Sequence, residues 1–136
     1  MANLPLLGTR VLILEDDFWQ ADDGRAQLID AGAEIVTMTG SIESAFASLV
    51  TRNLDIGLLD INLKGLHSFE VARALLGSGV PVLFLTGYES NVLPADLANV
   101  PLITKPINWI VVISQLTRML GKPDQMAIDG GGPNSG

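Results

Sequence analysis

Apolar and polar residues are grouped in blocks along this chain. Continuous apolar runs cover residues 11–14, 56–59 and 82–85, a shorter one covers 102–103, and a run interrupted by Thr37 covers 35–38. Between them, apolar residues recur mostly with helical spacing. Strands that are apolar without alternation are typical of parallel sheets buried on both faces. The pattern therefore predicts five strand–helix units, (βα)5, with helices on both sides of a parallel sheet.

The predicted helices cover 18–31, a stretch that begins after Ser41, another after Ser68, and 108–120. Ser41 and Ser68 are the expected N-caps. The segment 88–99 is the weakest, because Pro94 limits any helix there to a short one that begins at the proline. The predicted fold class is α/β: a flavodoxin-like, doubly wound sheet with strand order 2-1-3-4-5.

The domain organisation follows from shifts in composition. Residues 1–8 are expected to form an N-terminal leader, and residues 9–120 a single folded domain. From residue 121 the sequence is rich in Gly, Pro and polar residues, which predicts a disordered C-terminal tail.

Charge and composition narrow the class of partner. The 136 residues include 15 acidic and 8 basic ones, so the net charge is −7, which argues against a nucleic-acid surface. The sequence contains no cysteine, and its longest apolar runs are far shorter than the roughly 20 residues that span a bilayer. No signal peptide is recognisable, so we expect a cytoplasmic protein with no membrane contact.

Acidic residues follow two of the predicted strands. Glu15 and Asp16 come after the first strand, and Asp60 ends the third. These strands are neighbours in the predicted order, and carboxylates that converge repel each other unless a cation lies between them. All-oxygen ligands favour Mg²⁺. Acids that merely cap helices are the alternative, which fits one such residue better than three.

Asp60 has a further possibility as a nucleophile toward a phosphoryl group. Such a transfer requires positive charge and hydrogen-bond donors around the phosphoryl oxygens. Thr86 and Lys105 follow the fourth and fifth strands and supply a hydroxyl and an ammonium. Either residue alone is more simply a helix-capping Thr or a surface Lys, so the hypothesis depends on their joint position.

Together these residues resemble the receiver domain of two-component response regulators, in particular its stand-alone type. The matching set is Glu15-Asp16, Asp60, Thr86-Gly87 and Lys105-Pro106, over about residues 9–120. The resemblance implies that a histidine kinase or histidine phosphotransfer protein phosphorylates Asp60. It also implies a Mg²⁺ site formed by Glu15, Asp16, Asp60 and the Asn62 main-chain carbonyl, phosphoryl contacts from Thr86 and Lys105, and a cis peptide before Pro106.

The resemblance further implies a signalling protein rather than a turnover enzyme. Its output partner is unknown, and a homodimer is one possibility. We expect the signalling surface to comprise residues 88–99 and the start of the last helix. Residues 109–113 are all apolar, so they cover more than one face of a helix. Either this helix is unusually buried or it exposes an apolar contact patch, and the sequence favours neither.

The chain departs from the receiver pattern at three positions. Lys64 replaces a proline, Ser68 replaces a glycine, and Leu102 replaces the aromatic residue that couples phosphorylation to output. Tyr88 is a candidate substitute for that aromatic residue, although a surface tyrosine is the simpler interpretation. His67, the only histidine, is expected to be a solvent-exposed loop residue.

Three other functions are compatible with parts of the pattern. A degenerate receiver would bind partners without phosphorylation, which the intact Asp60, Thr86 and Lys105 argue against. A phosphatase of the haloacid dehalogenase type needs an acid two residues after its nucleophile, where this chain has Asn62. A flavin-binding module of the same fold needs a Ser/Thr/Gly-rich phosphate loop after the first strand, and none follows.

Overall fold

The computed structural model describes residues 4–87 and 93–121. Five parallel strands form the sheet in the order β2-β1-β3-β6-β7, which is the predicted order 2-1-3-4-5 of the sheet strands. They are β1 (Arg10–Leu14), β2 (Ile35–Thr39), β3 (Ile56–Asp60), β6 (Val82–Thr86) and β7 (Leu102–Thr104). The predicted α/β, flavodoxin-like fold is confirmed, and each strand includes the apolar run from which it was predicted.

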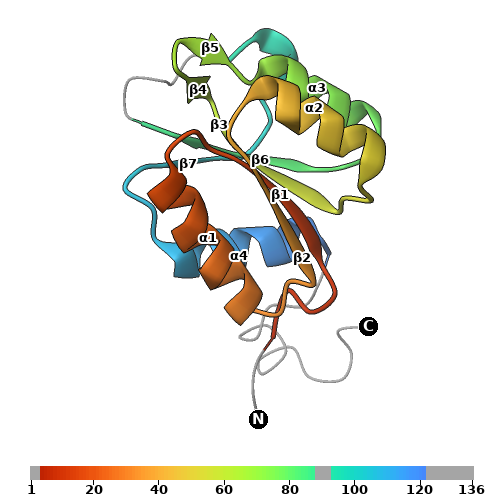
Figure 1. The fold of residues 1–136 in the computed structure, drawn as a ribbon, viewed down its shortest axis with the longest axis vertical. Coiled ribbons are helices and arrows are strands. Elements are labelled where there is room, and N and C mark those ends of the chain that lie inside the picture. The colour runs from red at the N-terminus through yellow and green to blue at the C-terminus, as the bar shows by residue number, and fades with distance from the viewer. Residues whose placement is uncertain (1–3, 88–92, 122–136) are drawn as a thin grey trace.

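Helices cover both faces of the sheet (Figure 1). On one face lie α1 (Phe18–Asp30) and α4 (Trp109–Met119), and on the other lie α2 (Ile42–Thr51) and α3 (Phe69–Gly77). The apolar residues of β1 divide between the two cores: Val11 and Ile13 pack on the α1/α4 side, and Leu12 and Leu14 on the opposite side. Burial of alternate residues on opposite faces explains why the strand sequence is continuously apolar.

The connection between β6 and β7 contains a short helix, as the proline predicted. It is the 3₁₀ helix η1 (Ala95–Leu97), and Pro94 is its N-cap residue. The guanidinium of Arg73 on α3 binds the Asp96 carboxylate of η1 through two nitrogens, at 2.7 and 3.0 Å. The first part of this connection, including Tyr88, lies outside the described residues.

The two predicted serine caps have different outcomes. The Ser41 hydroxyl accepts a hydrogen bond from Ser44 N at 3.1 Å and caps α2. Ser68 precedes α3, but its side chain makes no capping bond, and its buried hydroxyl has no hydrogen-bond partner among the described residues. Ser68 is therefore the N-cap residue of α3, as expected, but its hydroxyl does not cap the helix.

Two features, one before β1 and one after β3, were not predicted from the sequence pattern. Leu6, within the expected leader, is fully buried in the α1/α4 core, and its N–H donates to Ala31 O at 2.9 Å. After β3, β4 (Asn62–Leu63) and β5 (Leu66–His67) form an antiparallel hairpin. Its two turn residues, Lys64 and Gly65, have positive φ angles of 50° and 87°, as tight hairpin turns require.

Within the described ranges, no helix has both the length and the apolar character needed to cross a membrane.

Candidate functional site

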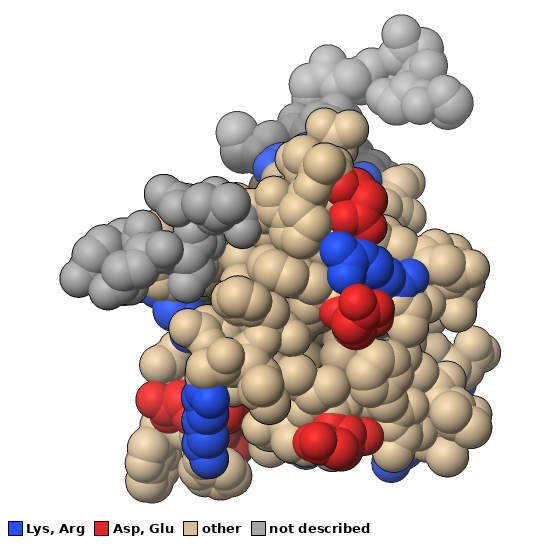
Figure 2. Space-filling model, turned by 90° about the horizontal axis from the view of Figure 1, so that it is seen from above, with Lys and Arg blue, Asp and Glu red and all other residues tan. Residues whose placement is uncertain are grey.

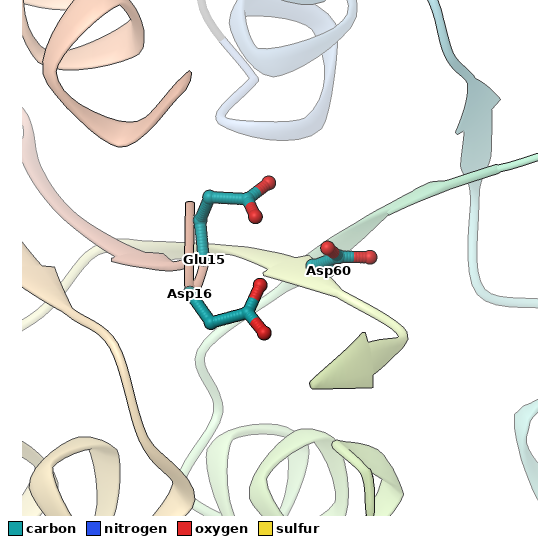
Figure 3. Close-up of side chains that lie close together, drawn as sticks. All are labelled: Glu15, Asp16 and Asp60. Atoms are coloured by element: carbon teal, nitrogen blue, oxygen red, sulfur yellow. The ribbon is translucent and has the colours of Figure 1, made fainter. Parts of the chain in front are cut away.

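The strand register places the acidic residues side by side. Leu14 of β1 pairs with Leu59 of β3, so Glu15 and Asp60, the residues that follow, lie at adjacent strand ends. Figure 3 shows the carboxylates of Glu15, Asp16 and Asp60 gathered at these two strand ends, with Glu15 above the strands in the view and Asp16 below them. One oxygen of each lies within 4.8 Å of one oxygen of each other carboxylate. The predicted convergence of three carboxylates is therefore present in the fold.

Burial distinguishes the three acids. Glu15 and Asp60 are only 7% and 8% exposed, whereas Asp16 is half-buried. Burial, more than any other factor, raises the pKa of Glu15 above its ordinary value, although the hydrogen bonds from Lys105 and from the Asp17 N–H oppose the shift. A buried carboxylate with raised pKa gains most from a cation placed next to it.

Lys105 reaches the acids from the end of the edge strand β7. The N–H of Lys105 donates to Thr86 O at 2.7 Å, which fixes the residue directly after β7. Its ammonium Nζ lies 2.9 Å from Glu15 Oε1 and 3.1 Å from Asp60 Oδ2. Burial alone would lower the pKa of Lys105, but the two carboxylates outweigh it and raise that pKa. The repulsion predicted for converging acids is thus offset by a cation that belongs to the chain itself.

Thr86 and Asn62 complete the predicted set. Thr86 ends β6, is almost fully buried, and its hydroxyl donates to Gly87 O at 3.0 Å. Asn62 begins β4, its N–H lies 3.4 Å from Asp60 Oδ1, and its side-chain oxygen accepts from Gly65 N at 3.1 Å. The Asn62 side chain thus stabilises the hairpin turn, leaving its main-chain carbonyl as the group proposed for a metal.

Oxygen ligands of this kind fit Mg²⁺. Three carboxylates from two strand ends, with no histidine or thiol among them, make a hard donor set. Glu15 and Asp60 each contact Lys105, so a dication at this position would compete with the ammonium for the same oxygens. The residues present are therefore suited to hold Mg²⁺ and to exchange partners when it binds.

The peptide bond between Lys105 and Pro106 is cis, as predicted. Leu102, at the position of the missing aromatic residue, is a half-buried strand residue that packs in the α2/α3 core. His67 is exposed as predicted, but it belongs to β5 and stacks on Phe69 with ring centroids 4.8 Å apart.

A contact between α1 and α4 was missed in the sequence. Gly24 of α1 faces the indole of Trp109, and a Cβ at Gly24 would lie 2.7 Å from a Trp109 ring carbon. The indole N–H also donates to Asp23 Oδ2 at 3.2 Å. The available signal was Gly24 itself, since a glycine inside a helix lowers stability unless something needs the space.

Known proteins of similar fold are response regulator receivers. A receiver protein from Burkholderia phymatum has a TM-score of 0.74 at 23% identity, covering 86% of this chain and 98% of that one. The PhyR receiver domain from Erythrobacter litoralis has a TM-score of 0.75 at 25% identity, covering 87% and 96%. The chain thus has the receiver fold, and the resemblance predicted from its residues is confirmed.

A curated relative supports the same class. The sensory transduction protein LytT of Bacillus subtilis is 29% identical over 103 residues, which is 73% of this chain. The match covers 43% of that protein, so the chain spans less than half the length of this relative. No family model matches the sequence. The similarities indicate a receiver module of two-component signalling.

Proposed function

We propose that the protein is a phosphoacceptor receiver of a two-component phosphorelay, with Asp60 as the phosphorylated residue. The observation that carries the proposal is the position of the Asp60 carboxylate, buried beside two further acids and 3.1 Å from the Lys105 ammonium. The donor would be a histidine kinase or a histidine phosphotransfer protein.

The chemistry is a transfer of one phosphoryl group. A carboxylate oxygen of Asp60 forms a bond to phosphorus, and the bond from phosphorus to the donor breaks, with its electron pair leaving on the donor. Lys105 and the Thr86 hydroxyl then contact phosphoryl oxygens. Glu15, Asp16, Asp60 and the Asn62 carbonyl would hold Mg²⁺, which supplies positive charge to the transferring group.

The role is signalling through protein contacts rather than substrate turnover, in the cytoplasm. At the start of α4, Ile110 and Val111 are 80% and 48% exposed, whereas Val112 is fully buried. Of the two alternatives for residues 109–113, the exposed patch is the one present. It offers contact area for an output protein or a second copy of the chain. The remaining candidate surface is the segment 88–99, of which residues 88–92 lie outside the described residues.

Intact mass measurement tests the proposal. The purified protein is incubated with a small phosphodonor such as acetyl phosphate, with Mg²⁺ or with EDTA. We expect one phosphoryl adduct in the presence of Mg²⁺ and little in EDTA. A folded protein that gains no adduct from the small donor or from a panel of phosphorylated histidine kinases would instead be a degenerate receiver. Leu102, which replaces the aromatic residue of the receiver pattern, is also compatible with that function.

A further inference from the structure

A cavity of about 310 Å³ lies beside the phosphorylation site without including Asp60. Its inner wall is apolar and comes from the ends of β1 and β6, with Ile13, Leu14 and Leu85 all buried. The loop from Lys105 to Ile107 forms a second wall, and the Trp109 indole a third. An apolar cavity with a few convergent polar groups is the usual form of a small-molecule site.

Two polar contacts join side chains of the cavity lining, one at its buried end and one at its exposed end. At the inner end, Lys105 Nζ binds Glu15 Oε1 at 2.9 Å. At the outer end, Trp109 Nε1 donates to Asp23 Oδ2 at 3.2 Å, while the indole is pressed against Gly24. Both α1 and α4 are thereby fixed on either side of the space. The cavity is therefore built into the packing of these helices.

Carboxylates of the protein already engage much of the N–H donor capacity in the lining. Each lining side chain with an N–H donor already donates to a carboxylate: Lys105 to Glu15 and Asp60, Gln20 to Asp17, and Trp109 to Asp23. In contrast, Asp23 Oδ1 accepts no hydrogen bond within the described part of the chain. The site thus offers a free acceptor on an exposed carboxylate and an aromatic face that favours cations.

We propose that this cavity binds a small organic ammonium ligand with an apolar or aromatic body. The body would fill the space against Ile13, Leu85 and Trp109, and the ammonium would donate to Asp23. Because Glu15 and Lys105 line the inner end, such a ligand would also touch two groups of the proposed phosphorylation site. Binding and phosphorylation would then influence each other reciprocally.

Tryptophan fluorescence provides the direct assay. The chain has two tryptophans, and Trp19→Phe leaves Trp109 in the cavity wall as the sole reporter. In about 0.15 M salt, which screens non-specific attraction to the acidic surface, phenethylamine should cause a saturable change. The anion 3-phenylpropionate and the neutral 2-phenylethanol, which share its aromatic body, should bind at least about fivefold more weakly.

Matched variants locate the ammonium. Asp23→Asn should weaken phenethylamine binding at least about fivefold, whereas Asp22→Asn, an equal charge change on an exposed neighbour outside the lining, should alter it less than twofold. Asp60→Asn should retain binding, so the cavity can fail or succeed independently of phosphorylation. Absence of saturation in folded protein, equal binding of the anion, or equal losses in the two variants would overturn the proposal.

Discussion

The two halves of the candidate site are built differently. Its acids lie at the ends of β1 and β3, adjacent strands in the middle of the sheet, where Glu15 and Asp60 are nearly buried. Its donors are Thr86, which ends β6, and Lys105, which directly follows the edge strand β7, a strand of three half-exposed or exposed residues. Lys105 covers the remaining distance with its long side chain, and its side chain is 22% exposed. The positions of the short acidic side chains therefore depend on strand register, whereas the position of the Lys105 ammonium depends on the contacts that hold its loop.

Loss of the ammonium should give the largest effect. Lys105→Met keeps an unbranched side chain, shorter by one atom, and removes its charge. We therefore expect phosphorylation by a small donor to slow about 100-fold, in line with the loss of one preorganised donor. Lys64→Met, on the exposed hairpin turn, is the matched control and should stay within about twofold. Equal rates in the two variants would remove Lys105 from the proposed mechanism.

The packing of Trp109 on Gly24 joins α4, the helix that follows Lys105, to α1. Gly24→Ala would place a methyl group 2.7 Å from the indole, and we expect a loss of about 1–3 kcal/mol in the free energy of unfolding. Gly77→Ala in α3, where a Cβ would meet nothing within 4 Å, should be neutral or stabilising. Denaturant melts of both variants make the comparison. A neutral Gly24→Ala would mean that the indole does not need this space.

The contributions of the individual acids to stability can be separated by neutralising one carboxylate at a time and measuring the melting temperature without Mg²⁺. Asp16 makes no ion pair in the described structure, so Asp16→Asn should raise the melting temperature by relieving repulsion. Glu15→Gln removes the cost of burying that charge, but it also removes a partner of the half-buried Lys105, so it should raise the melting temperature less than Asp16→Asn does. We expect the Asp16→Asn shift to correspond to about 1 kcal/mol. Both variants should lose stabilisation by added Mg²⁺. A lower melting temperature for Asp16→Asn would contradict this expectation.

The ion pair that joins α3 to η1 should give the smallest effect, and one that depends on pH. Hydrogen bonds from Arg73 hold the pKa of Asp96 below its ordinary value of 3.8. The pair therefore stabilises the fold above that pKa, and its contribution is lost as the pH falls through the lower, folded-state value. Asp96→Asn should melt slightly below wild type at pH 7, and the difference should shrink as the pH falls through the folded-state pKa of Asp96.

Asp30→Asn, at the exposed end of α1, controls for the change in net charge. If Asp96→Asn and Asp30→Asn shift the melting temperature equally at pH 7, the ion pair contributes nothing measurable.

The two halves also differ in how much the sequence could predict. The apolar runs end at the functional residues, so strand order alone placed Glu15, Asp16 and Asp60 together. The contact of Lys105 with both acids could not be predicted, because it depends on a long side chain and on the position of a loop. Gly24 illustrates the same limit. Helix propensity shows only that a glycine lowers the stability of α1, whereas the fold shows that the Trp109 indole occupies the space that a side chain at residue 24 would need.

Ser68 and the β4–β5 hairpin were also beyond the sequence pattern. Its position before an apolar helical stretch predicted that the Ser68 hydroxyl would cap the helix. Tertiary packing instead buries this hydroxyl without a hydrogen-bond partner within the described residues. Lys64-Gly65 was a usable turn signal, since a glycine commonly takes the positive φ that a tight hairpin needs. It was overlooked because the flanking strands have only two residues each.

The central claim is that Asp60 itself receives the phosphoryl group. Borohydride reduces an aspartyl phosphate to homoserine, which marks the modified residue permanently. Protein phosphorylated in Mg²⁺ is reduced, digested and sequenced by mass spectrometry, with Asp60→Asn treated in parallel. We predict homoserine at residue 60 in the wild type and none in the variant. Two results would contradict the account. One is homoserine at residue 16, or the corresponding alcohol at residue 15, with none at residue 60, and the other is an adduct of equal yield in Asp60→Asn.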